Sequence, residues 1–271
     1  MFLSVTVALP FVFILGLVVG SFLNVVIYRL RHPQAGRFWQ GRSRCPHCSH
    51  VLGLRELIPL FSFLWQKGKC RSCGKKIDIQ YPLVELATAL LFSLVFVQRF
   101  GWDGMIPLSG KQWVFLFQLS RDWFIVSMAI LVFVYDLRYM MILDAVMLPA
   151  VITVFVLNLL LGFSLPDMLI AAVVGFGFFA LQFFLSKGAW IGGGDMRLGF
   201  FMGLVLGWQL LLLALFLAYL IGALSAIILI VFGKKTWGQK IPFGTFLSLA
   251  LVSALTFGES ILAWYMNLLG L

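Results

Sequence analysis

Charged side chains are scarce in this sequence. They make up 11% of its 271 residues, ten of them are acidic, and hydrophobic residues account for 62%. With a mean hydropathy of +1.04, the chain carries more apolar surface than the core of a soluble protein of this size needs. The composition therefore argues against a soluble globular class and indicates a polytopic membrane protein.

Apolar runs long enough to cross a bilayer predict an all-α fold with about eight transmembrane helices. Each crossing needs about 20 apolar residues in helical form, because a lipid-exposed backbone must satisfy its own hydrogen bonds. The expected helices lie near residues 4–28, 83–98, 123–136, 143–162, 167–186, 196–208, 209–232 and 244–267, the sixth being short. Residues 1–28 lack a basic n-region and an A-x-A site. They are therefore expected to be a retained first helix rather than a cleaved signal peptide.

Basic residues are distributed unevenly along the chain. Of the 20 Lys and Arg residues, 17 fall in the connections at 29–81, around 138, at 187–197 and at 234–240. By the positive-inside rule these connections face the cytoplasm, and both termini lie outside. This topology accounts for the net charge of +10, so no nucleic-acid partner is expected, whereas attraction to anionic membrane lipid is.

All four cysteines lie in the long polar segment 29–81. They form two C-x-x-C knuckles separated by 21 residues, CPHC at Cys45 and Cys48 and CRSC at Cys70 and Cys73. This is the spacing of a zinc ribbon, in which each knuckle supplies two thiolates to one tetrahedral ion. The sequence therefore predicts a cytoplasmic zinc-binding loop.

Disulfides or redox thiols are the alternative for these cysteines. A cytoplasmic loop is reducing, and a segment of this length has too little apolar mass to fold alone, so zinc is favoured. His47 and His50 flank the first knuckle. Four thiolates already complete the metal shell, so both histidines are expected to be surface residues.

The acidic residues are few enough to consider one by one. Solvated charges are expected for the residues in outer loops or near outer helix ends, Asp103, Asp122, Asp167 and Glu259, while Glu56 and Asp78 lie in the cysteine segment. The remaining four, Glu85, Asp136, Asp144 and Asp195, lie close to cytoplasmic helix ends. An ionisable group is costly there and marks a candidate functional site.

Asp136 and Asp195 are expected at similar depth on the same side of the membrane. Two carboxylates brought together cannot both ionise easily, so one keeps its proton while the other stays a base. An aspartic protease uses such a pair to activate a water and to protonate the carbonyl and the leaving amine. Gly192, Gly193 and Gly194 would let an extended substrate backbone approach closely. The alternatives are a simple helix cap for the glycines and a structural hydrogen bond for a buried aspartate.

Several motifs in this order resemble those of the bacterial type IV prepilin peptidases. These leader peptidases with N-methyltransferase activity belong to the GxGD class of membrane aspartic proteases. The motifs are GSFLNVVIYRL (20–30), the paired knuckles, LIPLFSFLWQKGKC (57–70), YPLVEL (81–86), DLRYMMILDAVMLP (136–149), GGGDMRLGF (192–200) and IPFGTFL (241–247). The resemblance implies that Asp136 and Asp195 are catalytic.

Three positions depart from the usual pattern of that family. Leu143 stands where a proline usually precedes the next aspartate, Arg197 replaces a lysine, and Thr245 replaces the second proline of PFGPF. Arg197 keeps a positive charge but cannot act as a neutral amine. None of the three removes a carboxylate or a cysteine.

The resemblance also implies an organisation and a set of partners. The parts are a first transmembrane helix at 1–28, the zinc-binding loop at 29–81 and a membrane peptidase domain at 82–271. The expected client is a prepilin or pseudopilin precursor of a type IV pilus or type II secretion system. Its basic leader would be cut at the cytoplasmic edge of the bacterial inner membrane.

Methylation of the new N-terminus would require S-adenosylmethionine as a second cofactor, in addition to the Zn²⁺ of the loop. No G-x-G-x-x-G motif predicts a soluble nucleotide-binding fold, so this activity rests on the resemblance. Glu85 is a candidate for that second site. The alternative for Glu85 is a helix-end charge that pairs with the basic loop.

Two other classes of function remain open. A transporter also places carboxylates at broken helices, but it would carry binding groups near the midplane and an internal repeat. A zinc-ribbon scaffold of a pilus or secretion assembly would explain the loop but leave Asp136 and Asp195 without a role.

The charge distribution makes a prediction about orientation. A membrane-impermeant thiol probe should label a cysteine introduced at Ser109 in spheroplasts, while a cysteine at Thr236 stays protected until lysis. The reverse labelling pattern would overturn the topology.

Overall fold

The computed structural model describes residues 2–32, 41–101, 105–107, 112–233, 236 and 239–270. Asp103, Ser109 and Lys111 lie outside these residues. By its packing the chain divides into two compact units, Met1–Trp113 and Val114–Leu271. The boundaries at residues 28 and 81 remain a prediction. In packing terms, the helix that follows the cysteine segment belongs with the first helix.

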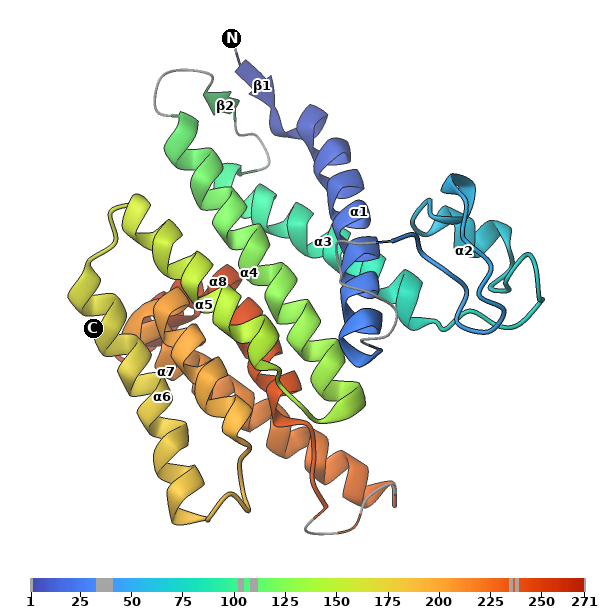
Figure 1. The fold of residues 1–271 in the computed structure, drawn as a ribbon. Coiled ribbons are helices and arrows are strands. Elements are labelled where there is room, and N and C mark those ends of the chain that lie inside the picture. Colours follow the sequence, from blue (N-terminus) through green and yellow to red (C-terminus); the bar gives the residue numbers. More distant parts are fainter. Residues whose placement is uncertain are drawn as a thin grey trace. The chain divides into compact units, whose positions relative to one another are not determined.

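The first unit is built on two long helices joined by the cysteine segment (Figure 1). Its elements are β1 (Phe2–Ser4), α1 (Val5–Arg31), η2 (Leu54–Glu56), α2 (Phe61–Trp65), α3 (Gln80–Phe100) and β2 (Met105–Pro107). The two strands pair antiparallel, with Phe2 opposite Pro107. This short ribbon is an addition to the all-helical prediction.

Small residues let α1 and α3 approach closely. A Cβ added to Gly16 would lie 2.5 Å from the Cα of Ala89, and one added to Gly20 would lie 2.7 Å from the Cα of Glu85. Glycines four residues apart lie on one helix face and allow backbones to pack without a hydrophobic driving force, as is typical of membrane helices. The contact brings Glu85 into the helix interface.

The second unit consists of α4 (Gln112–Tyr139), α5 (Asp144–Leu160), α6 (Leu165–Leu185), α7 (Gly193–Val231) and α8 (Phe243–Leu268). In α7, Gly207 has a φ of 72° and divides the helix into two parts. This break lies next to the predicted boundary between the helices at 196–208 and 209–232. Over the described residues, α1, α3, α4, α6, α7 and α8 are long and apolar enough to cross a membrane. The all-helical membrane class is confirmed.

The first part of α7 packs tightly against α6. A Cβ on Gly199 would lie 2.5 Å from the carbonyl oxygen of Gly175, and a Cβ on Gly203 would overlap the carbonyl of Ala171. Both helices therefore present small residues at four-residue spacing to each other. This contact fixes the position of the segment that carries Asp195.

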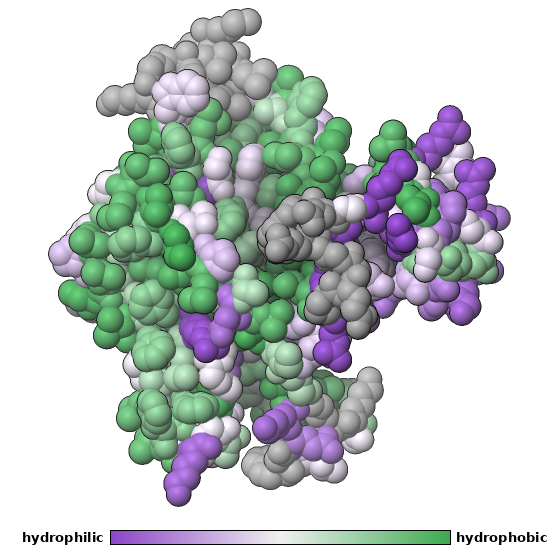
Figure 2. Space-filling model, viewed as in Figure 1, coloured by the Kyte–Doolittle hydropathy of each residue, from purple (hydrophilic) through white to green (hydrophobic). Residues whose placement is uncertain are grey.

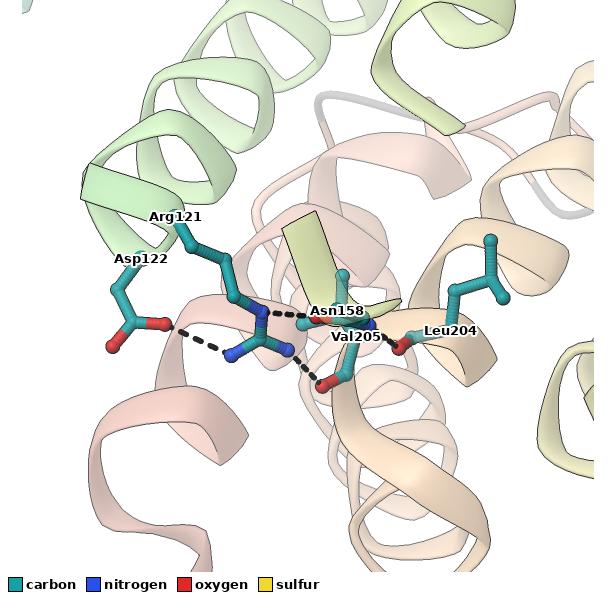
Figure 3. A network of polar contacts seen from close by, with 5 residues as sticks. All are labelled: Arg121, Asp122, Asn158, Leu204 and Val205. Carbon is teal, nitrogen blue, oxygen red and sulfur yellow. Dashed lines mark hydrogen bonds and ion pairs between the residues drawn. The ribbon is translucent and has the colours of Figure 1, made fainter. Parts of the chain in front are cut away.

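A buried polar network closes the break in α7 (Figure 3). Asn158 of α5 donates to the carbonyl of Leu204 at 2.8 Å, and the guanidinium of Arg121 of α4 donates to that of Val205 at 2.8 Å. Because the helix is interrupted at Gly207, these carbonyls lose their intrahelical N–H partners. The two side chains supply the missing donors in an apolar interior.

Asp122 completes this network and corrects one prediction. Its carboxylate accepts a hydrogen bond from Arg121 at 3.1 Å, and both side chains are buried. The expectation of a solvated charge at Asp122 is wrong, because the arginine that caps α7 needs a buried counter-charge. Asp167 and Glu259 are exposed, as expected.

Candidate active site and metal site

Asp136 lies in the last turn of α4 and is 5% exposed. Its Oδ2 atom accepts hydrogen bonds from the backbone N–H of Thr245 at 2.9 Å and from the Thr245 hydroxyl at 3.3 Å. Thr245 is the third residue of α8, where backbone N–H groups have no partner within the helix. Asp136 therefore caps the start of α8 from another helix.

Asp195 caps the start of its own helix. It is the third residue of α7 and is 7% exposed. Its Oδ2 accepts a hydrogen bond from the N–H of Gly192 at 3.0 Å, while its own N–H donates to the carbonyl of Gly192 at 3.1 Å. The bond from the Gly192 N–H to the Asp195 carboxylate is the half of a capping box that the third helical residue supplies. The carboxylate is held on the side of the first turn.

The two aspartates line one pocket of about 390 Å³ within the second unit. The other lining residues come from the α4–α5 turn, from the segment that leads into α7 with the first residues of that helix, and from the segment that leads into α8 with its first residue: Met140–Leu143, Gly188–Gly194 and Lys240–Phe243. The carboxylates of Asp136 and Asp195 are near enough to interact electrostatically. Residues 59 positions apart in the sequence are therefore brought together where three helix ends meet.

The three glycines before Asp195 differ in their surroundings. A Cβ on Gly194 would lie 2.7 Å from the Cβ of Ile142, so close packing against the α4–α5 turn requires a glycine there. Cβ atoms on Gly192 and Gly193 would meet their nearest neighbours at 3.5 and 3.7 Å, which is ordinary contact. Gly194 thus has a packing role. Substrate approach over Gly192 and Gly193 stays a prediction.

The arrangement has the chemistry of an acid–base pair. In general, two carboxylates that lie close together cannot both ionise easily, so one keeps its proton as an acid while the other can act as a base. Backbone bonds hold one oxygen of each, so neither side chain is free to rotate away. Such a pair can activate a water for attack on a peptide carbonyl.

Asp144 lies apart from this pair. It is the first residue of α5, is exposed and forms an ion pair with Arg197 of α7. The described lining of the pocket does not include it. An exposed ion pair of this kind contributes little stability, about 0–1 kcal/mol.

The four cysteines converge in the first unit. Their sulfur atoms all lie within 4.8 Å of one another, and the Cys45 and Cys73 sulfurs are 4.0 Å apart. Four thiolates around one Zn²⁺ lie about 3.8 Å apart, whereas a disulfide needs about 2 Å. The donor set and its spacing fit a structural zinc site and not a pair of disulfides.

The two knuckles have matching backbone geometry. The N–H of Ser49 donates to Cys45 O, and that of Gly74 donates to Cys70 O, both at 2.9 Å. Ser49 and Gly74 occupy the same position in each knuckle and have φ values of 58° and 68°. The repeat turns both cysteine pairs toward a common centre.

Local hydrogen bonds prepare one of these thiols for metal binding. The N–H groups of Cys73 and then Ser72 stabilise the Cys70 thiolate and lower its pKa to about 7. The thiolate is the form that binds zinc. His47 and His50 are exposed and lie outside the cysteine cluster, as expected.

Glu85 is buried, and in the part of the chain that the structure describes its environment does not show the expected pairing with a basic side chain. Its Oε2 accepts a hydrogen bond from the backbone N–H of Leu60 at 2.8 Å. Leu60 precedes α2 and has a φ of 60°, which is strained for a residue with a side chain. Within the described residues Glu85 ties the cysteine segment to α3 and forms no ion pair with a basic side chain. A role in methyl transfer stays a prediction.

Sequence reasoning missed the partners that hold the acidic residues. Thr245 departs from the pattern of the resembled family, but the sequence does not indicate its contact with Asp136. Nothing in the sequence marks Ile142 or Lys240 as pocket residues. Arg121, Asp122 and Asn158 could have been found, because three strongly polar residues inside apolar runs are costly unless they pair.

The zinc site makes a prediction about metal content. Purified, reduced protein should contain about one zinc per chain. Cys70→Ser should lower zinc content and increase proteolysis within residues 41–79, since metal binding supplies much of the folding free energy of such a segment. Metal analysis and limited proteolysis measure both, with His47→Ser as the control that keeps zinc. Freshly prepared parent protein without zinc would contradict the assignment.

Comparison with known proteins places the chain among membrane peptidases. Residues 14–99 match the family described as "Bacterial Peptidase A24 N-terminal domain", and residues 123–227 match the "Type IV leader peptidase family". No solved structure matches the chain.

Relatives named "Prepilin leader peptidase/N-methyltransferase" align over nearly the whole chain. The relative from Aeromonas hydrophila is 36% identical over 94% of this chain and 93% of its own length. That from Bacillus subtilis is 34% identical over 96% and 98%, and that from Pseudomonas aeruginosa is 33% identical over 95% and 93%. With its paired aspartates and clustered cysteines, the chain belongs to the type IV leader peptidase family.

Proposed function

We propose that this chain is a membrane aspartic endopeptidase that cleaves the leader of a prepilin or pseudopilin precursor. One observation carries the proposal: Asp136 and Asp195, both buried, line a single pocket at the ends of membrane-length helices. The names of its relatives supply the substrate class.

The aspartates perform the hydrolysis as a pair. One carboxylate takes a proton from a water, whose oxygen attacks the carbonyl of the scissile peptide bond, while the other protonates the carbonyl oxygen. The tetrahedral intermediate collapses when a proton is delivered to the leaving amine. Water is consumed, and the leader and the mature chain are released.

The pocket lies in the inner membrane and faces the cytoplasm. The bias of Lys and Arg toward the connections that flank Asp136 and Asp195 supports this orientation. A precursor whose basic leader remains in the cytoplasm presents its cleavage point at that edge of the membrane.

Methylation of the newly exposed N-terminus is the second activity. The relatives' names support it, and S-adenosylmethionine would donate the methyl group. Zn²⁺ bound by the four cysteines would hold the loop in one fold. Transfer of labelled methyl from S-adenosylmethionine to the cleaved client tests this activity, and a product without label argues against it.

A scaffold or a transporter explains the molecule less well. A scaffold has no use for two buried carboxylates that share a pocket. A transporter would place its polar groups near the membrane midplane, whereas Asp136 lies in the last turn of α4 and Asp195 in the first turn of α7.

Substitution of either aspartate tests the proposed chemistry. Asp136→Asn and Asp195→Asn should each lower the rate of leader cleavage by at least about 10²–10⁴-fold, because each removes one member of the acid–base pair. The double variant should be little worse, since the two residues act as a unit. Cleavage of a prepilin-like precursor by detergent-solubilised protein measures the effect.

Asp144→Asn is the matched control for this experiment. It makes the same chemical change at an exposed aspartate outside the described pocket lining, so it should keep substantial activity. All variants are compared at equal membrane abundance. Near-parental cleavage by Asp136→Asn or Asp195→Asn would sink the aspartic-dyad mechanism.

A further inference from the structure

The cysteine segment exposes an apolar face that the zinc site does not explain. Phe61, Leu64 and Trp65 are 64%, 70% and 88% exposed. They stand at positions i, i+3 and i+4 of α2 and therefore share one side of that helix. Phe63 belongs to the inner side, because its ring packs against Gly68. The large side chains of α2 thus divide into an inner and an outer set.

The segment that carries this apolar face is rich in basic residues. Between residues 41 and 79 the chain carries eight Lys and Arg residues, all exposed, and two acidic residues. The basic residues are Arg42, Arg44, Arg55, Lys67, Lys69, Arg71, Lys75 and Lys76. Figure 2 shows this segment, at the right of the view, as mostly hydrophilic with separate hydrophobic side chains. Lys67 and Lys69 lie shortly after the end of α2 at Trp65.

We propose that Phe61, Leu64 and Trp65 insert into the headgroup region of an anionic membrane surface. Tryptophan and neighbouring apolar side chains favour that region, and basic residues beside them attract anionic lipid. The segment is joined at both ends to membrane-length helices of the same unit, α1 and α3. The segment is therefore already held next to the membrane, and insertion of the three side chains would fix the distance of the zinc loop from the membrane surface.

Charge favours lipid over the other occupants of such a face. A basic leader would be repelled by eight exposed cations, and a second copy of this loop would bring eight more. An anionic lipid headgroup is attracted to them instead. The apolar side chains alone would not separate these partners, whereas the surrounding charge does.

Photo-crosslinking identifies the occupant directly. The photoreactive residue p-benzoyl-phenylalanine replaces Trp65 in the full-length protein, which is placed in nanodiscs of phosphatidylethanolamine and phosphatidylglycerol. His47 is the control position, because it is exposed in the same segment but lies in the first knuckle. Zinc content of each variant verifies that the loop has folded.

Lipid adducts at position 65 are expected to exceed those at position 47 by several-fold. They should fall when phosphatidylglycerol is replaced by phosphatidylcholine. Adducts with a second copy, with a precursor protein or with another part of the same chain would overturn the proposal. Equal lipid labelling at positions 65 and 47 would do so as well.

A different observation concerns the support of Asp136. Both the N–H and the hydroxyl of Thr245 donate to the same oxygen, Oδ2, and Thr245 is buried. A proline at this position would offer neither donor.

We infer that Thr245 is a positioning residue for Asp136. With Oδ2 held by two donors from one residue, the carboxylate plane is fixed and the other oxygen is left for water or substrate. Thr245 is not among the described residues that line the pocket, so it acts through Asp136. This inference rests on the proposed peptidase function.

Three substitutions separate the two donors. Thr245→Val keeps the N–H and the shape, and it should lower kcat by about 5-fold, the equivalent of one typical hydrogen bond. Thr245→Pro removes both donors and should lower kcat further, while a first-turn proline leaves α8 intact. Thr245→Ser keeps both donors and should restore the parental kcat. KM for the precursor should not change in any of them.

Thr256→Val is the control. The Thr256 hydroxyl donates a hydrogen bond to the carbonyl of Val252 within α8, about three turns of the helix away from Thr245. This substitution should leave kcat unchanged. Parental kcat in both Thr245→Val and Thr245→Pro, or a change confined to KM, would overturn the role of Thr245. If Asp136→Asn is inactive while the Thr245 variants keep parental kcat, only the role of Thr245 fails and the peptidase proposal stands. Failure of the peptidase proposal would instead appear as activity in Asp136→Asn.

Discussion

The need to satisfy backbone groups at helix ends inside an apolar protein governs the second unit. Water cannot supply partners in such an interior, so each end that is buried needs a side chain. Three ends are treated in this way. Asp136 caps α8, Asp195 caps α7, and Arg121 with Asn158 closes the break at Gly207. Most of the buried polar side chains near these helix ends therefore serve to satisfy backbone hydrogen-bonding groups.

Close helix contacts determine where these caps meet. α7 approaches α6 through Gly199 and Gly203, and the turn after α4 approaches α7 through Gly194 against Ile142. Larger residues at these positions would push α7 away and separate the two carboxylates. The apolar packing of the unit therefore sets the geometry of its polar pocket, although no packing residue needs to touch a substrate.

Much of the fold and of the candidate site could be predicted from the sequence. Long apolar runs specify helices because the bilayer permits few other structures, and paired C-x-x-C knuckles specify their own geometry. Asp136 and Asp195 stood out because carboxylates are rare in such runs. The kink at Gly207, the cap from Thr245 and the burial of Asp122 depend on contacts between distant segments. Local pattern carries no information about which partner a polar residue finds.

One carboxylate can both cap a helix and take part in proton transfer. Capping uses one oxygen as a hydrogen-bond acceptor, which in both aspartates is Oδ2. Proton transfer needs the other oxygen, and it benefits from a side chain that cannot rotate. An asparagine in place of the aspartate keeps an oxygen that can accept the capping hydrogen bond, but it cannot take up or release a proton as a carboxylate does. The helix ends can then stay formed while the proposed acid–base chemistry is lost, so the structural role of these aspartates can be separated from their proposed catalytic role.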